Sequence, residues 1–159
     1  MLLIRPAHPS DMEALAHLFL HARRVAFSWV DSALFQLADF APQTQGETIW
    51  VAALAEGPMV GFISVWQPTC FVHHLFVAPS YQGQGIGQQL LASLTTWLPL
   101  PYTLKCLTRN TQALTFYQKN GWWQAGSGGQ GDDAYQLLQL GTAPPAHTSG
   151  SGLSTERKQ

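Results

Sequence analysis

The chain of 159 residues is 46% hydrophobic and only 11% charged, which is typical of one globular domain with a large core. Its formal net charge of −1, without a basic block, argues against nucleic acid or an anionic membrane surface as the main partner. No stretch approaches about 18 uninterrupted apolar residues and the N-terminus lacks a signal-peptide pattern, so we expect a cytoplasmic protein without a membrane partner.

The first third of the chain predicts a short strand followed by two helices. Residues 2–4 form the strand, and Ser10 and Glu13 have the spacing of a capping box at the start of the first helix. Asp31 is the expected N-cap of a second, shorter helix. Residues 40–47, which contain proline and glycine, indicate a loop.

Two pairs of residues with metal-binding side chains occur along the chain. His17 and His21 lie one helical turn apart, a spacing that suits a metal ion, but no third ligand is evident nearby. We therefore interpret both histidines as facing solvent. Cys70 and Cys106 lie in predicted strands and are expected to be reduced, buried thiols. The sequence thus predicts no metal site.

Three β-rich runs follow the first helices. Residues 48–54 and 59–66 flank a Gly-Pro turn and predict an antiparallel hairpin. Residues 71–77, rich in aromatic and β-branched side chains and followed by Ala-Pro-Ser, predict a buried strand that ends in a turn.

The segment 82–87, Gln-Gly-Gln-Gly-Ile-Gly, separates this strand from a run with helical apolar spacing that ends at Leu98. Glycines at a strand-to-helix turn let the backbone approach a ligand closely. The unpaired N–H groups of the first helical turn, together with the positive end of the helix dipole, favour an anion there. We therefore expect a phosphate or pyrophosphate as the ligand.

Two common phosphate motifs do not fit this spacing. A P-loop requires Lys and then Ser or Thr after its last glycine, where this chain has Ile86 and Gly87. The dinucleotide fingerprint, counted from Gly83, requires a glycine where the chain has Gln88, and no acidic residue follows about twenty residues later.

The C-terminal part continues the alternation of strands and helices. The expected elements, in order, are a strand at 102–108, a helix at 110–120 closed by Gly121, a strand from Trp122, a glycine-rich loop at 126–133 and a strand at 134–140. Residues 142–159, rich in Pro, Gly and Ser and without an apolar period, are expected to form a tail outside a single domain at 1–141.

Two of these segments resemble the GNAT superfamily of acetyl-CoA-dependent N-acetyltransferases. The first is the Gln-x-x-Gly-x-Gly pattern that begins at Gln82, with the Leu-Phe-Val-Ala-Pro strand before it. The second runs from Asn110 to Gly121 and contains Phe116 and Tyr117 on its helix. The resemblance covers residues 2–140 and implies a mixed α/β fold with a predominantly antiparallel sheet, in the order strand, two helices, three strands, helix, strand, helix, two strands.

The resemblance also implies acetyl-CoA as co-substrate. In the family, backbone amides of the glycine turn hold the pyrophosphate, and the pantetheine arm lies along the preceding strand, where a backbone amide polarises the thioester carbonyl. The positions that inherit cofactor contacts are Leu75, Phe76, Val77, Gln82, Gly83, Gln84, Gly85, Ile86, Gly87, Gln88, Asn110 and Phe116.

Tyr117 stands where family members often place the general acid that protonates the coenzyme A thiolate. A phenol, whose pKa is ordinarily near ~10, can donate a proton at neutral pH. The alternative is a tyrosine that merely packs on the strand-facing side of its helix.

His73 and His74 are the candidate general bases for the amine. Histidine is the residue type matched to this task near neutral pH. Alternation along a strand places the two side chains on opposite faces, unless a bulge intervenes. Many family members carry an acidic residue or a histidine at the position of His73, so we favour His73, with His74 as a core histidine.

The acceptor is the least defined part of the sequence interpretation. Trp29, Trp66 and Phe71 are candidates for the walls of its pocket. Few acidic residues are present to attract a polycation, so we expect a small, partly apolar primary amine. A non-catalytic acyl-CoA sensor and a nucleotide-binding module are the alternatives, and a homodimer is left open.

Overall fold

The computed structural model describes residues 1–142, which contain seven strands and four α-helices. The tail predicted from residue 142 onwards lies, except for its first residue, outside the described residues. The chain divides into two compact units, Met1–Leu98 and Pro99–Gln159. The order of strands and helices agrees with the prediction, and the mixed, mainly antiparallel α/β fold is confirmed.

The first unit is built on four antiparallel strands. They lie in the order of the chain, and the predicted hairpin between the second and third strands is confirmed. Their bounds are Leu2–Pro6 for β1, Thr48–Leu54 for β2, Met59–Trp66 for β3 and Phe71–Val77 for β4.

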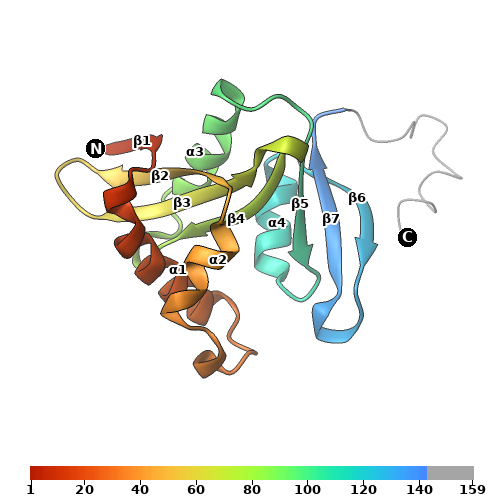
Figure 1. The fold of residues 1–159 in the computed structure, drawn as a ribbon. Helices are drawn as coiled ribbons and strands as arrows, with labels where there is room; N and C mark the ends of the chain where they lie inside the picture. The colour runs from red at the N-terminus through yellow and green to blue at the C-terminus, as the bar shows by residue number, and fades with distance from the viewer. Residues whose placement is uncertain (143–159) are drawn as a thin grey trace, which may run out of the picture. The chain divides into compact units, whose positions relative to one another are not determined.

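Helices cover both faces of these four strands (Figure 1). On one face, Phe19 of α1 (Met12–Ala26) and Phe40 of α2 (Phe40–Thr44) pack edge-on against Phe62 of β3, with ring centroids 6.0 and 5.7 Å away. Neighbouring strand residues point to opposite faces. Gly61 therefore faces α3 (Ile86–Ser93), where an added Cβ would lie only 3.2 Å from a methyl carbon of Leu90. Glycine at this position lets α3 pack directly on the strand.

The start of α1 differs from the predicted capping box. A short 3-10 turn, Pro9–Asp11, precedes the helix, and Asp11 takes the role expected of Ser10 and Glu13. The Asp11 carboxylate accepts a hydrogen bond from the backbone N–H of His8 at 2.7 Å and another from Arg5 at 2.8 Å. The hydrogen bond from Arg5 is the main reason that the pKa of Asp11 is lowered. Asp11, which accepts hydrogen bonds from two donors, therefore caps this turn in place of the predicted Ser10 and Glu13.

The second predicted helix is also different. Asp31 caps a 3-10 turn at Ser32–Leu34, a second such turn follows at Leu37–Asp39, and the α-helix begins only at Phe40, in the predicted loop. Pro42 is compatible with this helix because it is the third residue, where a backbone N–H has no partner within the helix.

As far as residue 142, the second unit consists of three antiparallel strands and one α-helix. The strand β7 (Tyr135–Leu140) pairs with both β5 (Tyr102–Leu107) and β6 (Trp123–Gly128). The helix α4 (Thr111–Lys119) begins one residue later than predicted, because Asn110 caps it with its side chain. Gly121, at φ +92°, follows its end, as the sequence predicts.

The predicted loop at 126–133 is shorter than expected because β6 continues to Gly128. The ring of Tyr135, on the paired strand, lies over Gly128, where an added Cβ would be 2.6 Å from the ring carbon that bears the hydroxyl. Gly128 can belong to the strand because it has no side chain, which leaves room for the ring of Tyr135.

The two cysteines lie in different settings and both are free. Cys106 is buried in β5, and this burial raises the pKa of its thiol to about 11. Cys70 is not in a strand, contrary to the prediction: it occupies a left-handed turn between β3 and β4 and is half-buried.

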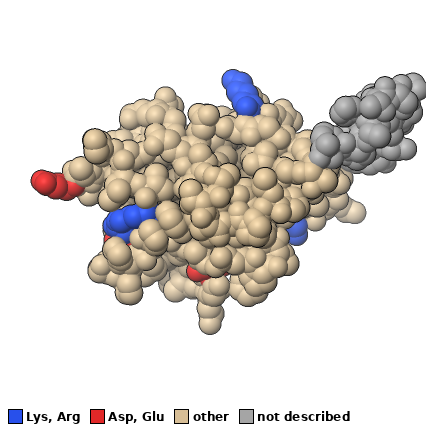
Figure 2. All heavy atoms as spheres, turned by 90° about the horizontal axis from the view of Figure 1, so that it is seen from above, with Lys and Arg blue, Asp and Glu red and all other residues tan. Residues whose placement is uncertain are grey.

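The surface agrees with the low charge content of the sequence. On the face seen in Figure 2, Lys, Arg, Asp and Glu side chains are few and scattered. Within residues 1–142, no helix has the length and apolar character needed to cross a membrane.

Candidate active site

The glycine-rich turn follows β4 and a 3-10 turn at Pro79–Tyr81. Gly83 and Gly85 have φ angles of +81° and +82°, a conformation that other residues rarely adopt. An added Cβ at either glycine would meet no atom within 4 Å. Glycine is therefore required here by backbone conformation, and the space beside the turn is open to a ligand.

The turn leads into the first residues of α3, with Gly85 as the N-cap. The N–H of Gln89 bonds to the carbonyl of Gly85 at 3.1 Å, so helix geometry leaves the N–H groups of Ile86, Gly87 and Gln88 without partners within the helix. No acidic residue stands in this first turn. These donors and the helix dipole favour an anion at this place.

Along β4 the backbone hydrogen-bonding groups point alternately toward β3 and away from it. Ala78 donates its N–H to the carbonyl of Val60 on β3 at 2.8 Å, and the pairing of Phe62 with Phe76 continues the ladder. Because hydrogen-bonded and non-hydrogen-bonded pairs alternate in an antiparallel ladder, the backbone groups of Leu75 and Val77 point away from β3. The Gln82 side chain reaches back and donates to the Val77 carbonyl at 3.1 Å.

A bulge in β4 places the two histidines differently from the prediction. Ser64 pairs with His74 and Val65 pairs with Val72, so His73 is the extra residue without a partner on β3. The two imidazole centroids lie 3.8 Å apart, on the same side of the strand and not on opposite faces. The bulge breaks the two-residue alternation from which opposite faces were predicted.

His73 is bound to an acidic residue that the sequence analysis missed. Its Nδ1 lies 2.6 Å from Oε2 of Glu47, and the other carboxylate oxygen of Glu47 accepts a hydrogen bond from the Ser64 hydroxyl. The Glu47 side chain is 8% exposed and the His73 side chain is 38% exposed. Glu47 lies in the predicted loop before β2, so no local pattern could have identified it; only the strand register brings it to His73.

His74 lies deeper than His73. Its ring packs edge-on against Phe19 with a centroid distance of 4.9 Å, and its Nε2 is 3.4 Å from the backbone carbonyl of Gln43. Burial, followed by the nearby charge of His73, lowers the pKa of His74 to about 3. The imidazole of His74 is therefore neutral at physiological pH and binds a proton only weakly, which suits a core histidine.

Glu47, His73 and His74 also have the composition of some metal centres, since one nitrogen or oxygen atom of each lies within 4.8 Å of the others. Both carboxylate oxygens and Nδ1 of His73 nevertheless have hydrogen-bond partners within the protein. The interactions of the three side chains are thus explained without an ion, and the absence of a metal stays a prediction.

Tyr117 belongs to the second unit. Its ring packs edge-on against Phe116 and Trp122 with centroid distances of 5.3 and 5.6 Å. Burial, and to a smaller extent the neighbouring Cys106, raises the pKa of the Tyr117 phenol. The phenol holds its proton at neutral pH with or without this shift, and the raised pKa makes it a weaker proton donor than an exposed tyrosine.

One of the three candidate acceptor residues, Phe71, lies beside His73, and a second, Trp66, is the partner of Phe71 on the neighbouring strand. Trp66 is 42% exposed and pairs with Phe71 across β3 and β4, and the ring of Phe71 is 6.0 Å from that of His73. Trp29 packs instead edge-on against Phe27 at 5.6 Å. Trp66 and Phe71 therefore form aromatic surroundings for the exposed imidazole.

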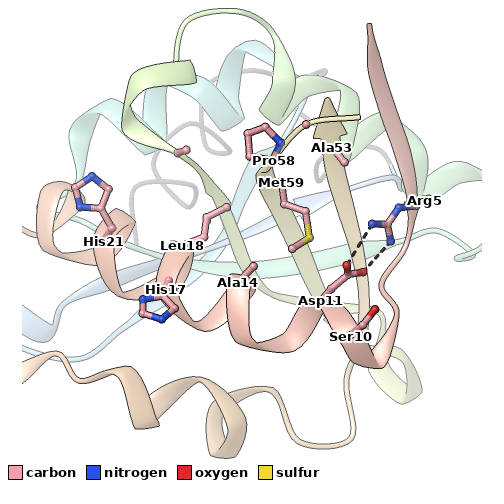
Figure 3. A pocket seen from close by; sticks show the side chains of 12 residues that line it. Arg5, Ser10, Asp11, Ala14, His17, Leu18, His21, Ala53, Pro58 and Met59 are labelled. Carbon is pink, nitrogen blue, oxygen red and sulfur yellow. Dashed lines mark hydrogen bonds and ion pairs between the residues drawn. The ribbon is translucent and has the colours of Figure 1, made fainter. Parts of the chain in front are cut away.

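A groove of about 730 Å³ lies elsewhere in the first unit, between α1 and the turn that joins β2 to β3 (Figure 3). Its lining residues are Arg5, Ser10, Asp11, Ala14, His17, Leu18, His21, Ala53, Gly57, Pro58, Met59 and Ala78. None of the candidate catalytic or cofactor residues lines it. His17 and His21 are exposed, in agreement with their interpretation from the sequence.

These features define a mixed α/β protein with a glycine-rich turn between a strand and a helix. The chain belongs to the GNAT acetyltransferase family, because the model of the acetyltransferase (GNAT) domain matches residues 45–124. This range includes Glu47, both histidines, the glycine-rich turn and Tyr117.

Two curated relatives are N-acetyltransferases. The chain is 33% identical over 106 residues to the peptidyl-lysine N-acetyltransferase YjaB of Salmonella typhimurium. This alignment covers 65% of this chain and 69% of that protein. The chain is also 30% identical over 105 residues to the aminoglycoside N(6')-acetyltransferase type 1 of Stenotrophomonas maltophilia. This alignment covers 59% of this chain and 65% of that protein.

Solved structures confirm the fold. A GCN5-related N-acetyltransferase from Rhodopseudomonas palustris matches with a TM-score of 0.71 and 22% identity, over 88% of this chain and 95% of that chain. The PaiA N-acetyltransferase from Thermoplasma acidophilum, solved in complex with coenzyme A, matches with a TM-score of 0.72 and 16% identity, over 89% of this chain and 99% of that chain. At these identities the likeness concerns the fold alone.

Proposed function

We propose that this protein transfers the acetyl group of acetyl-CoA to a primary amine of a small-molecule acceptor in the cytoplasm. The amine attacks directly in a ternary complex, without an acyl-enzyme. The observation that carries this proposal is the open glycine-rich turn at the start of α3, in a chain that belongs to the GNAT family. Much of the rate then comes from holding the two reactants in the correct orientation.

The turn and the strand before it have separate roles in binding. The N–H groups of Ile86, Gly87 and Gln88 receive the pyrophosphate, with Gln82 to Gly85 shaping the approach. Leu75 and Val77 bind the pantetheine arm through their backbone groups, and an amide near Phe76 polarises the thioester carbonyl.

Two side chains handle protons in this proposal. His73 accepts the proton of the substrate ammonium, because it is the more exposed of the two histidines, while the low pKa of His74 makes that side chain a poor base. Tyr117 donates a proton to the departing coenzyme A thiolate. Asn110 contributes by capping α4, the helix that carries Phe116 and Tyr117.

The acceptor class rests on the surroundings of His73. Trp66 and Phe71 offer aromatic surface, and the charged residues of the whole chain amount to only 11%, which favours a small and partly apolar amine. The names of the two curated relatives add a peptide lysine and an aminoglycoside as amines to be compared. A homodimer, and the absence of nucleic-acid and membrane partners, stay predictions.

A panel of amines, assayed by the release of free coenzyme A thiol, tests the proposal. The panel includes a lysine peptide, an aminoglycoside and small aromatic and aliphatic primary amines, each compared with a tertiary amine of similar size. We expect thiol release to depend on the primary amine. Tight acetyl-CoA binding without amine-dependent release for any member would instead favour the acyl-CoA sensor.

A further inference from the structure

The contacts of Glu47 give this residue a role in the proposed reaction. We propose that Glu47, anchored by Ser64, is a positioning residue that fixes the tautomer of His73, so that Nε2 carries the free lone pair. The consequence for catalysis rests on the proposed function; the tautomer itself does not.

The tautomer follows from the donors and acceptors in the set. An ionised carboxylate can only accept hydrogen bonds, so the 2.6 Å contact between Oε2 of Glu47 and Nδ1 of His73 requires the proton on Nδ1. In the neutral imidazole, Nε2 then has no proton and can accept one. His73 is the bulge residue without a partner on β3, and the contact of its Nδ1 with Glu47 fixes the orientation of its ring.

The carboxylate is itself held in place. Ser64 is fully buried on β3, and its hydroxyl donates to the second oxygen of Glu47. A carboxylate with 8% exposure and two hydrogen-bond partners differs from a mobile surface ion pair, which contributes little. Ser64, Glu47 and His73 therefore form a connected chain from the core to the exposed imidazole.

The chemical step uses this arrangement directly. Nε2 of His73 accepts a proton from the substrate ammonium, and the resulting imidazolium faces the Glu47 carboxylate. The freed amine forms a bond to the acetyl carbonyl carbon while the C–S bond breaks. The thiolate leaves with the electron pair and takes the proton of Tyr117. The acylated nitrogen loses its second proton to solvent to give the neutral amide, the Tyr117 phenolate takes a proton back from solvent, and His73 releases its proton to solvent, so that one proton is released overall. No oxidant or further reactant is needed.

Nitrogen-15 NMR of the histidine rings tests the tautomer without reference to activity. In the wild-type protein at a pH where His73 is neutral, its ring should show the signature of protonated Nδ1. In Glu47→Ala no carboxylate accepts a hydrogen bond from Nδ1, so the signature of protonated Nδ1 should weaken in favour of protonated Nε2. The exposed His17 is the internal control and should be unchanged. Protonated Nε2 in the wild type, or the same tautomer in both proteins, would overturn the proposal.

Kinetics test the catalytic consequence separately. Glu47→Ala should lower kcat/KM by less than the about 10²–10⁴-fold that a general base contributes, because His73 itself remains, and the acetyl-CoA Kd should be unchanged. Ser64→Ala should lower it less, because Glu47 keeps its bond to His73. A changed tautomer with an unaltered kcat/KM would support Glu47 as the positioning residue and refute His73 as the base, so the two claims fail separately.

Discussion

Replacing His74 by glutamine removes a buried imidazole from the core while keeping a side-chain donor for the carbonyl of Gln43. The wild-type imidazole has a pKa of about 3 in the folded protein against an ordinary value of 6.5, because burial and the neighbouring His73 disfavour its charged form. As the pH falls below about 6.5, the unfolded chain binds a proton that the folded protein does not, so the free energy of unfolding decreases. This loss continues until the pH approaches 3.

The magnitude follows from the difference between the two pKa values. Between pH 6 and pH 4 the imbalance costs about 1.4 kcal/mol per pH unit. From pH 7 to pH 5 the His74 contribution therefore amounts to about 2 kcal/mol, and it is insensitive to the folded pKa as long as that value lies well below 5. His73, Arg23 and Glu47 also face His74, and all three residues are present in both proteins.

Urea unfolding of wild type and His74→Gln at pH 7 and pH 5 measures this difference. The wild type should lose about 2 kcal/mol more than the variant over this interval, even if the variant is less stable at pH 7. His17→Gln, at an exposed position on α1, is the matched control and should follow the wild type. Parallel losses in wild type and His74→Gln would refute the assignment of His74 as a neutral core histidine.

Three further predictions concern the site. Gly85→Asp should weaken acetyl-CoA binding at least about tenfold more than the isosteric Gly85→Asn, because only the aspartate places a negative charge at the anion position; equal Kd values by calorimetry would remove the pyrophosphate from the turn. Tyr117→Phe should lower kcat with little change in acetyl-CoA Kd, measured where chemistry limits turnover, and a wild-type kcat would leave Tyr117 as a packing residue. His73→Ala should remove the rise of kcat/KM with pH that a histidine base produces, and if the rise instead follows the acceptor amine when amines of different basicity are compared, solvent takes the proton.

Local features of the sequence predicted the fold and the position of the glycine-rich turn between a strand and a helix. Such a turn can be predicted because only a few residues determine its geometry, and the glycines at 83 and 85 do have positive φ angles. The hairpin at 48–66 and the end of the fourth helix at Gly121 were predicted for the same reason. Where neighbouring polar residues compete, the prediction was wrong: Asp11 replaces the cap of Ser10 and Glu13 because Arg5, on β1, supplies a second donor.

The hydrogen-bonded histidine site depends on contacts that are distant in sequence. The register between β3 and β4 shifts after Ser64, and this shift makes His73 a bulge residue. Strand alternation in the sequence alone cannot predict such a shift. Glu47 reaches His73 from 26 positions earlier in the chain. Single-sequence patterns contain the residue types of this site but not the strand register that brings them together.

Acetylation of the amine itself tests the account most directly. Wild-type protein is incubated with acetyl-CoA carrying a labelled acetyl group and with each amine of the panel, and the amine is analysed by mass spectrometry. The account predicts label on the nitrogen of at least one primary amine, at a rate that falls much further in Gly85→Asp than in Gly85→Asn. Tight binding of acetyl-CoA without labelled product from any amine would contradict it.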